Sequence, residues 1–488
     1  MNKNPSQKLT VLEKIGYSLG DLAANLIFQT LMAFLAFFYT DIYKIPAAKA
    51  GTVMLVGGLI GACFNLVMGA IADRTNTRWG KFRPWVLWTA IPFGVIALLA
   101  FSTPNFNESG KVAYAFITYF LLVIIYSANN LPYSALSGVM TGDMKERNSL
   151  SSYRFVSVML AQFIIQVLLL PLAISMGHGD KAAGFEKVML VFSITGVICF
   201  LITFLTTKER IIPPAAQKTP FTQDLADLVK NKPWRIMLGL TVLVFITLAL
   251  RGGMNIYYFK YYLTADSQAS FLNDLGFNEM IDSLSKRFGE AAFEEFRKAD
   301  SAPYATASIV SGASTIAMIL GIFFSKPLAD RFGKRNTFGI FLVLSALCLV
   351  SVNFLSNTAV VAVFVLQVMY GFIYGITIPL LWAMIADVAD YSEWKNNRRA
   401  TAIIFSAMIF GLKAGLSIGG AISTWLLSLF GYNTEAAQQT AEAIHGIKLL
   451  VSVIPGLIFI GSAALLFGYG IDKKAELQIE KELKERRA

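Results

Sequence analysis

The sequence predicts an all-α polytopic membrane protein with twelve transmembrane helices in two six-helix bundles. Over 488 residues it is 55% hydrophobic and only 15% charged, with a mean hydropathy of +0.58, which is too apolar for a soluble protein of this size. Twelve nearly uncharged stretches are each long enough to cross a bilayer. They lie at about 20–42, 48–72, 84–103, 112–138, 154–176, 187–207, 236–262, 304–325, 337–355, 359–387, 402–430 and 447–471.

Two related loops indicate that the two bundles arose by internal duplication. The basic loop Asp73–Trp85 joins the second and third spans, and the shorter Asp330–Arg335 joins the matching spans of the second half. Duplicated six-helix halves with matching loops are typical of transporters.

The remaining polar stretches divide the chain. We expect an N-terminal bundle at 1–207, a proline-rich cytoplasmic linker at 208–235, a C-terminal bundle at 236–472 and a charged, solvated cytoplasmic tail at 473–488. The second bundle carries an acidic insert at 264–303 on its outer face. The insert either caps the outer mouth or contacts a partner, or it is a tolerated loop insertion.

The basic residues predict the orientation. With a cytoplasmic N-terminus, most of the 42 Lys and Arg fall in inner loops and tails, so both termini are predicted to be cytoplasmic. The net charge of +11 could also suggest nucleic acid, but no nucleic-acid-binding motif accompanies it, so no nucleic-acid partner is expected. The partner that composition does imply is the lipid bilayer.

Several chemistries are disfavoured. The only histidines, His178 and His445, map to outer loops, and Cys63, Cys199 and Cys348 fall inside apolar spans, so neither catalysis nor a metal site is expected. No phosphate-binding loop of the G-x-x-x-x-G-K-[ST] type occurs, which argues against a nucleotide-driven pump. We expect no enzyme activity and no cofactor.

Polar residues inside the apolar spans of the first half predict a polar cavity, because each costs free energy unless it faces a partner or water. Asp21 and Asn25 share one face of the first helix. Asn25, Asn65 and Asn130 each lie about 10 Å from the inner ends of their helices, and Tyr133 follows Asn130. The alternative for each Asn is an interhelical hydrogen bond that only holds the bundle together.

Buried cations mark the second half. Arg251 and Asn255 share a face of the seventh span, and Lys413 lies about 15 Å deep in the eleventh. Arg251 can bind a sugar hydroxyl or a carboxylate, or pair with an acid of the first helix. Either cation can therefore bind substrate, an anionic sugar included, or form a charge pair that locks two helices.

A third set of charged residues lies at the inner helix ends. Salt bridges there can lock the inner side while the outer side is open, so we interpret these residues as gates: Asp73, Arg74, Arg78, Arg83, Asp330, Arg331 and Asp387.

The loop motif Gly80-Lys-Phe-Arg-Pro-Trp-Val-Leu87 resembles the signature of the glycoside-pentoside-hexuronide:cation symporter family, to which melibiose permease belongs. The resemblance extends over nearly the whole chain, including Asp21, Asn130-Leu-Pro-Tyr133, Asp387 and Lys413. It implies the major facilitator fold, the bacterial cytoplasmic (inner) membrane, and import of glycosides by alternating access coupled to H⁺, Na⁺ or Li⁺.

The resemblance also exposes a departure. The family's cation site uses acids at positions that match Gly61, Asn65 and Asn130 here, and its sugar-binding acid on the first helix matches Asn25. An Arg on the fifth helix matches Arg154, and a Lys on the eleventh matches Lys413. Neutral amides do not supply the anionic field that a dehydrated Na⁺ needs.

We therefore predict a transporter that imports glycosides, oligosaccharides or hexuronides, with H⁺ preferred over Na⁺ as the coupling ion. Asp21 is the candidate for coupling; its alternative is a structural acid paired with Arg251 or Lys413. The predicted substrate-binding residues are Asn25, Asn65, Asn130, Tyr133, Arg154, Arg251, Asn255 and Lys413. The alternatives are an uncoupled sugar facilitator, a lysophospholipid carrier and a non-transporting membrane sensor.

Overall fold

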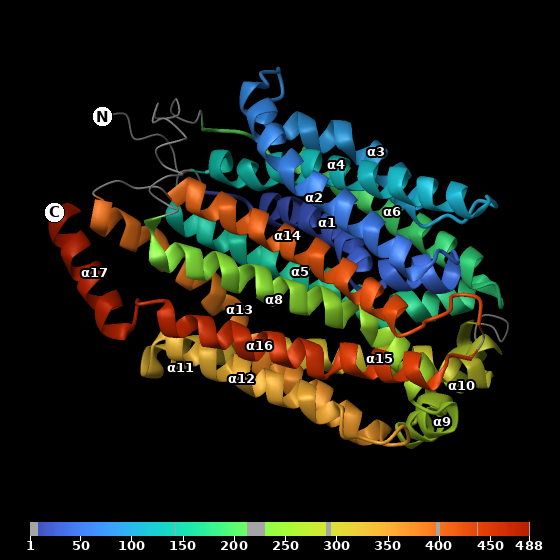
Figure 1. The fold of residues 1–488 in the computed structure, drawn as a ribbon. Coiled ribbons are helices and arrows are strands. Elements are labelled where there is room, and N and C mark those ends of the chain that lie inside the picture. Colours follow the sequence, from blue (N-terminus) through green and yellow to red (C-terminus); the bar gives the residue numbers. More distant parts are fainter. Residues whose placement is uncertain are drawn as a thin grey trace. The chain divides into compact units, whose positions relative to one another are not determined.

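A computed structural model describes residues 8–141, 143–211, 230–288, 294–396, 401–436 and 438–487. Over these residues the chain is helical, and twelve helices are long and apolar enough to cross a membrane (Figure 1). The predicted number of spans is confirmed. The first is longer than expected: it begins at Val11, nine residues before the predicted start at 20.

The chain forms two compact units. Unit 1 comprises residues 1–216 and 276–308, and unit 2 comprises 217–275 and 309–488. Most of the insert groups with unit 1, whereas we expected it in the C-terminal bundle.

Unit 1 contains the first six spans. Its long helices are α1 (Val11–Phe37), α2 (Ala47–Arg74), α3 (Arg83–Ala100), α4 (Glu108–Met140), α5 (Met144–Gly177) and α6 (Lys181–Thr206). Helix α1 packs on α5 and α6, α2 packs on α4, and α3 packs on α4 and α6. We call the end of unit 1 where α1 begins the proximal end and the other the distal end.

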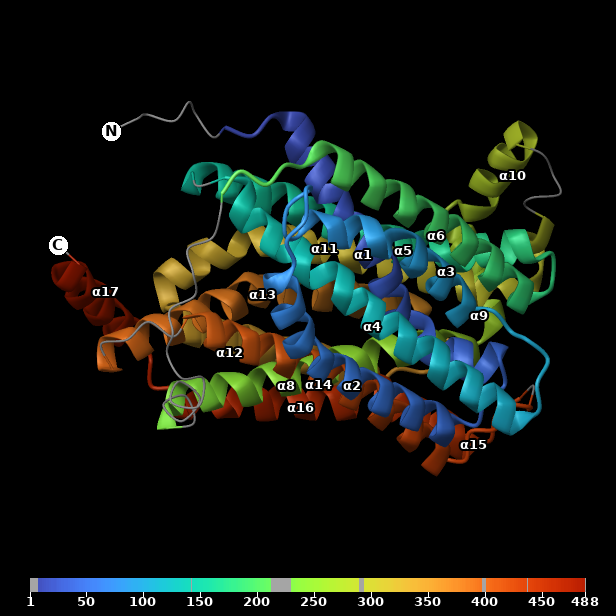
Figure 2. The same cartoon turned by 90° about the horizontal axis from the view of Figure 1, so that it is seen from above.

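Unit 2 contains the remaining spans. Its helices include α8 (Lys232–Tyr257), α12 (Lys334–Val352), α13 (Val360–Asn396), α14 (Thr401–Leu429), α15 (Ala441–Val451), α16 (Val453–Leu465) and the terminal α17 (Lys473–Arg487). Helix α8 packs on α14 and α16, and α12 packs on α13 and α16 (Figure 2). Helix α11 (Ala302–Phe332) contains the boundary between the units.

The first span of each half ends in the same unusual way. A π-helical turn continues α1 over Phe38–Ile42, and another continues α8 over Tyr258–Tyr262. π-Helical turns are rare, so finding one at the matching place in each half supports the internal duplication that the paired loops predicted.

The insert folds into short elements. They are α9 (Ala265–Asp274), α10 (Phe277–Phe288) and two 3₁₀ turns at Glu294–Arg297 and Ala299–Ser301. Tyr304, just after these turns, accepts a hydrogen bond at 3.0 Å from Lys181 at the start of α6. The second part of the insert is thereby fastened to the distal end of unit 1.

Side-chain caps explain where several helices begin. Thr10 and Glu13 form a capping box at the start of α1, and Asn107, Asp143 and Asp180 cap α4, α5 and α6. Glu13 also pairs with Arg210. Because these polar groups are all satisfied, α1 extends beyond the apolar stretch that hydropathy alone detects.

A glycine permits a close contact between α1 and α4. A Cβ atom on Gly20 of α1 would lie 2.4 Å from Cε2 of Tyr133 on α4. The Tyr133 ring stacks on Tyr17 at a centroid separation of 4.5 Å, and both rings are fully buried. Any side chain at position 20 must displace this stack.

We predict that Gly20→Ala lowers the free energy of unfolding by roughly 1–3 kcal/mol, the usual cost of overpacking a core. Thermal unfolding of the purified protein in detergent measures the effect. Gly138→Ala is the matched control, because a Cβ there meets no atom within 4 Å. Equal melting temperatures for the two variants would contradict the packing account.

Candidate functional site

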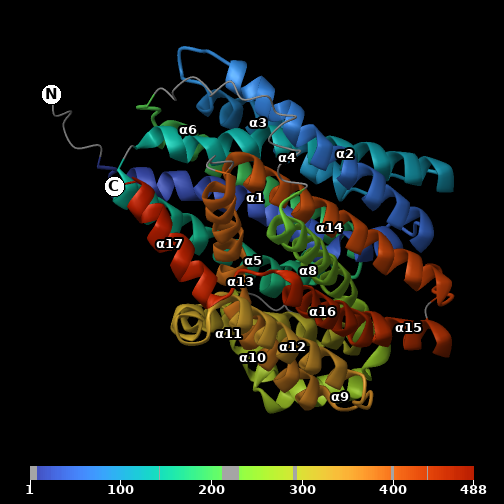
Figure 3. The same ribbon diagram turned by 60° about the vertical axis from the view of Figure 1, so that its left-hand side comes forward.

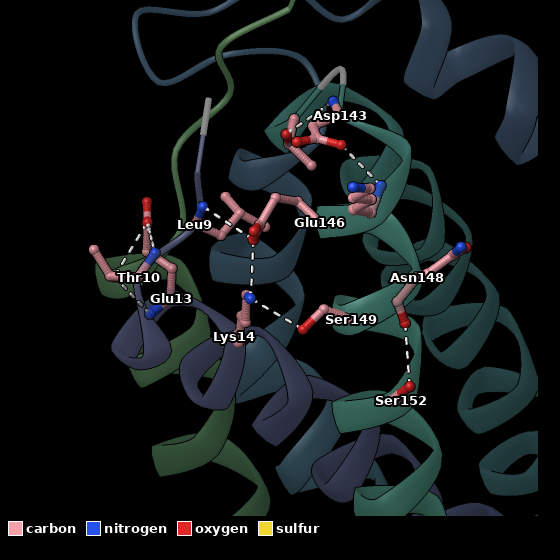
Figure 4. Close-up of polar contacts among 11 residues, drawn as sticks. Leu9, Thr10, Glu13, Lys14, Asp143, Glu146, Asn148, Ser149 and Ser152 are labelled. Atoms are coloured by element: carbon pink, nitrogen blue, oxygen red, sulfur yellow. Dashed lines mark hydrogen bonds and ion pairs between the residues drawn. The ribbon is translucent and has the colours of Figure 1, made fainter. Parts of the chain in front are cut away.

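Charged residues join α1 to α5 at the proximal end (Figure 4). Lys14 lies 2.9 Å from Glu146 and donates to Ser149 at 3.0 Å. The same Glu146 carboxylate accepts a hydrogen bond from the backbone N–H of Leu9 at 3.3 Å. These contacts fix the two helices in register where they begin.

Two turns deeper, a second ion pair joins the same helices with its charges reversed. Asp21 of α1 accepts from Nε of Arg154 of α5 at 2.5 Å, and a second guanidinium nitrogen lies 3.4 Å from the other carboxylate oxygen. The Asp21 side chain is 5% exposed and that of Arg154 is 27% exposed. The structure thus gives Asp21 a partner within its own unit, Arg154.

Tyrosine rings surround this pair. The Arg154 guanidinium carbon lies 5.4 Å from the Tyr133 ring centroid and 5.6 Å from that of Tyr17. The Tyr17 and Tyr133 hydroxyls each donate to the other residue's backbone carbonyl, at 2.8 and 2.6 Å. Tyr133 is therefore a buried residue that joins α1 to α4 through hydrogen bonds and ring stacking. Its expected contact with substrate stays a prediction.

The three candidate asparagines differ in their contacts. The Asn25 amide donates to the Asp21 carbonyl at 2.9 Å, and the Asn65 amide donates to Gly61 at 3.1 Å. Asn130 is half-buried, and its side chain has no hydrogen-bond partner among the described residues. Its amide is therefore available to a ligand.

In unit 2, Arg251 lies within a polar cluster formed by α8 and α13. Its guanidinium donates to Gln367 and lies 3.9 Å from the ring centroid of Tyr370. Tyr370 stacks on Tyr374. Within the described part of the chain, no carboxylate lies within ion-pair distance of Arg251. Its positive charge is thus stabilised by an amide oxygen and an aromatic face.

The same cluster contains several buried polar atoms without partners. Asn255 donates to Ser311 of α11 at 3.2 Å, but its carbonyl oxygen is unpaired. The other buried unpaired atoms here are Nε of Arg251, Nε2 of Gln367 and the hydroxyls of Tyr258 and Tyr370. Because buried polar groups are normally satisfied, this concentration indicates a place where water or a hydroxylated ligand binds.

Lys413 lies half-buried on α14. Its backbone carbonyl accepts from Ser417 at 2.9 Å. Its expected substrate role stays a prediction.

The basic α2–α3 loop at the proximal end binds an acid through its backbone. The Glu209 carboxylate accepts from the N–H groups of Lys81, Phe82 and Arg83 at 2.7–2.9 Å. Gly80 has φ +110°, and a Cβ there would lie 2.4 Å from the Glu209 carboxyl carbon. The glycine therefore lets the loop wrap the carboxylate at the N-terminus of α3, where the helix dipole favours an anion.

The arginines of this loop do not form the expected salt bridges with described acids. Arg83 donates to the Phe204 carbonyl at 2.7 Å and lies over the Phe204 ring. Arg78 lies over the neighbouring Trp79, and Arg74 is exposed. The side chain of Asp73 lies outside the described part. Glu209 holds the loop instead, because three N–H donors converge on it.

In unit 2, the gating candidate Asp387 pairs with a residue that the sequence analysis did not select. Lys334, at the start of α12, lies 2.6 Å from Asp387 and 2.9 Å from Glu476 of α17. Lys473 donates to the backbone carbonyl of Asp330 at 2.7 Å. Arg331 is exposed and lies over Phe332, so it is not the partner of Asp387.

The terminal helix α17 is docked, whereas we expected a solvated tail. It lies beside the end of α13 (Figure 3). The Trp394 indole donates to Glu482 at 2.5 Å, and Arg486 donates to the Trp394 carbonyl at 2.9 Å. The indole N–H lowers the pKa of Glu482. The charges of the tail are thus used in contacts with unit 2.

Sequence reasoning missed Glu209, Lys334 and Gln367. Glu209 and Lys334 lie at loop or helix ends rich in other charges, so composition did not single them out. Gln367 did carry a signal, because it is a polar residue inside the apolar stretch predicted at 359–387.

Twelve apolar spans with polar clusters inside both units define a multi-pass membrane transporter, not an enzyme. The chain belongs to the MFS/sugar transport protein family, whose model matches residues 16–286 and 303–473. This confirms the resemblance to the glycoside-pentoside-hexuronide:cation symporters and the major facilitator fold. The family model does not match residues 287–302 of the insert or the part of α17 that follows residue 473.

Similar proteins agree with this assignment. The chain is 35% identical to the inner membrane symporter YicJ of Escherichia coli (strain K12), over 95% of this chain and 92% of that protein. It is 32% identical to the isoprimeverose transporter of Lactiplantibacillus pentosus, over 94% and 89%. The fold resembles the inward-open structure of the xylose transporter XylE from E. coli, with a TM-score of 0.55, 12% identity and coverage of 96% and 98%. The chain is a multi-pass inner-membrane protein.

We predict that Glu209→Ala unfastens the α2–α3 loop. Loss of three hydrogen bonds to a carboxylate lowers stability by on the order of 2 kcal/mol. Faster hydrogen exchange at the Lys81, Phe82 and Arg83 amides measures the local effect. Glu442→Ala, which removes an exposed acid from α15, is the control. Unchanged exchange at these three amides would rule out Glu209 as the fastener.

Proposed function

We propose that this chain is a secondary active transporter that imports glycosides, oligosaccharides or hexuronides, with H⁺ rather than Na⁺ as the coupling ion. The observation that carries the proposal is the Asp21–Arg154 ion pair inside the spans of unit 1. Ionisable groups within a membrane are costly and commonly mark a proton or substrate pathway.

The pair supplies a simple coupling step. Protonation of a carboxylate oxygen of Asp21 removes the negative charge that holds Arg154. The guanidinium, already 27% exposed, then has donors available for sugar hydroxyls or a uronate carboxylate. Substrate and proton binding would thereby favour each other through one side chain.

The preference for H⁺ rests on the ligands that α2 and α4 lack. Residues 50–72 and 112–140 contain no Asp or Glu. The Asn65 amide already donates to its own helix, and hard cations such as Na⁺ are bound by oxygen ligands, usually with carboxylates among them. An uncoupled facilitator is the second candidate, and it is favoured by the same absence of carboxylates at Asn65 and Asn130.

The substrate class is supported by the cluster around Arg251. Its unpaired donors and acceptors suit a molecule with several hydroxyls, and the Tyr370 and Tyr374 rings suit the apolar face of a pyranose. The positive charge of Arg251 also accommodates a hexuronide. The relative named for isoprimeverose transport supports a glycoside.

We further propose that both termini and the proximal end of unit 1 face the cytoplasm. The basic α2–α3 loop and the charged α17 carry many of the Lys and Arg residues, as the positive-inside rule requires. In this orientation, Glu209 and the Lys334–Asp387 ion pair lie on the cytoplasmic side and stabilise the inner gate.

We predict that Asp21→Asn abolishes proton-driven accumulation of sugar, by about ten-fold or more, while equilibration down a sugar gradient persists. The measurement is uptake of labelled glycosides and glucuronides into proteoliposomes, with H⁺ and Na⁺ gradients imposed separately. Glu186→Gln, an exposed acid of α6, is the control and should retain accumulation.

Three outcomes of that experiment contradict the proposal. Accumulation driven by Na⁺ alone would reverse the choice of ion. Equilibration of the unmodified protein without accumulation under either gradient would establish a facilitator. Undiminished accumulation by Asp21→Asn would remove Asp21 from the coupling step.

We predict that Arg251→Gln raises the apparent KM for sugar about ten-fold or more, because a charge-assisted hydrogen bond to a ligand contributes about 1.5–3 kcal/mol. The increase should be larger for a glucuronide than for the neutral glycoside. Arg235→Gln, at an exposed position on the same helix, serves as the control. Equal KM values in both variants would place sugar binding away from Arg251.

A further inference from the structure

An apolar groove lies on unit 1 at its distal end, away from the polar cluster of Asp21. It has a volume of about 580 Å³ and runs between the first turns of α2 and α4, which pack side by side (Figures 1 and 2). Its apolar walls include Val53, Val56, Val112, Ala113 and Phe116. The lining on α2 runs from Ala48 to Val56, which is eight helical steps, so the groove is roughly 12 Å long.

A pair of opposite charges stands at the mouth of this groove. Lys49, which lines the groove, lies 2.5 Å from Glu108 at the start of α4. The two side chains are 50% and 56% exposed. A pair this exposed is weakly held, so both charges can be redirected to a ligand.

Aromatic residues near the mouth support its placement at a membrane surface. Tyr43 packs edge-on against Tyr114, which also contacts Phe106. The Tyr43 and Tyr114 hydroxyls donate to the carbonyls of Pro104 and Leu99. Tyrosine and lysine near the ends of spans are characteristic of the interface between hydrocarbon and headgroups. The charges thus lie at headgroup depth and the groove at acyl-chain depth.

From this arrangement we propose that the groove is a binding site for a phospholipid with a primary-amine zwitterionic headgroup, such as phosphatidylethanolamine. An acyl chain lies against Val53, Val112 and Phe116. The lipid phosphate accepts from Lys49, and the lipid ammonium donates to Glu108. Lys49 thus exchanges the Glu108 carboxylate for the lipid phosphate, and Glu108 exchanges the Lys49 ammonium for the lipid ammonium.

The two charges together select the headgroup. A phosphatidylcholine ammonium has no N–H to donate to Glu108, and phosphatidylglycerol offers no cation, so Glu108 would repel it. The lining covers about 12 Å of a hydrocarbon core that is about 30 Å thick, so the groove is suited to holding a lipid and does not by itself form a path across the membrane. The site is therefore separate from the proposed sugar pathway.

Native mass spectrometry of the detergent-purified protein, incubated with equal amounts of dioleoyl phosphatidylethanolamine, phosphatidylcholine and phosphatidylglycerol, tests the proposal. We expect at least five-fold more phosphatidylethanolamine than phosphatidylcholine to be retained. Glu108→Gln should reduce that preference to near unity, and Ala113→Trp, which fills the groove, should reduce retention of all three lipids. The controls are Glu442→Gln for charge and Ile194→Trp for a lipid-facing position on α6.

Equal retention of the first two lipids, strongest retention of phosphatidylglycerol, or an unchanged preference in Glu108→Gln would each overturn the proposal. A second measurement needs no variant. Phosphatidylethanolamine with a photoreactive acyl chain should label the peptides that contain residues 52–56 and 112–116 in the unmodified protein, and labelling spread evenly over exposed helices would also overturn it.

Discussion

The two ion pairs between α1 and α5 are the constraint on which unit 1 depends. Lys14 and Asp21 on one helix face Glu146 and Arg154 on the other, so the sign of the charge changes over two turns. Sliding one helix by that distance would bring Lys14 toward Arg154, and like charges in a medium of low dielectric repel strongly. The alternation therefore disfavours that shifted register. The observed register in turn sets the depth of the Tyr17–Tyr133 stack and of the Asn25 amide beside it.

The two units treat buried charge differently. In unit 1 a carboxylate neutralises the guanidinium of Arg154, whereas in the described part of unit 2 an amide and an aromatic ring surround Arg251. Protonation of Asp21 can remove the partner charge of Arg154. The neutral groups around Arg251 offer no comparable carboxylate to protonate. This difference supports the proposal that unit 1 couples the ion and unit 2 recognises the solute, although the matching π-helical turns of the two halves indicate a common origin.

The fold could be predicted well from the sequence, because length and apolarity alone define spans in a bilayer. The candidate site was predictable only in part. The pattern of polar residues in apolar stretches identified Asp21, Asn255 and Arg251 as candidates. Periodicity does not show which side chains pair, so the Asp21–Arg154 ion pair was not predicted. Charged loops were least predictable, because Glu209 binds backbone N–H groups, which every residue possesses and no composition reveals. The register of α17 on α13 depends on single contacts such as Trp394 to Glu482.

The docked terminal helix has a practical consequence for handling the protein. Arg486, in the last turn of α17, donates to the Trp394 carbonyl, and Glu476, in its first turn, pairs with Lys334. A bulky label attached between these two positions would compete with the contacts that hold α17 against α13. A label on an exposed position of another element, such as Glu442 of α15, leaves these contacts intact and is the better choice for handling the protein.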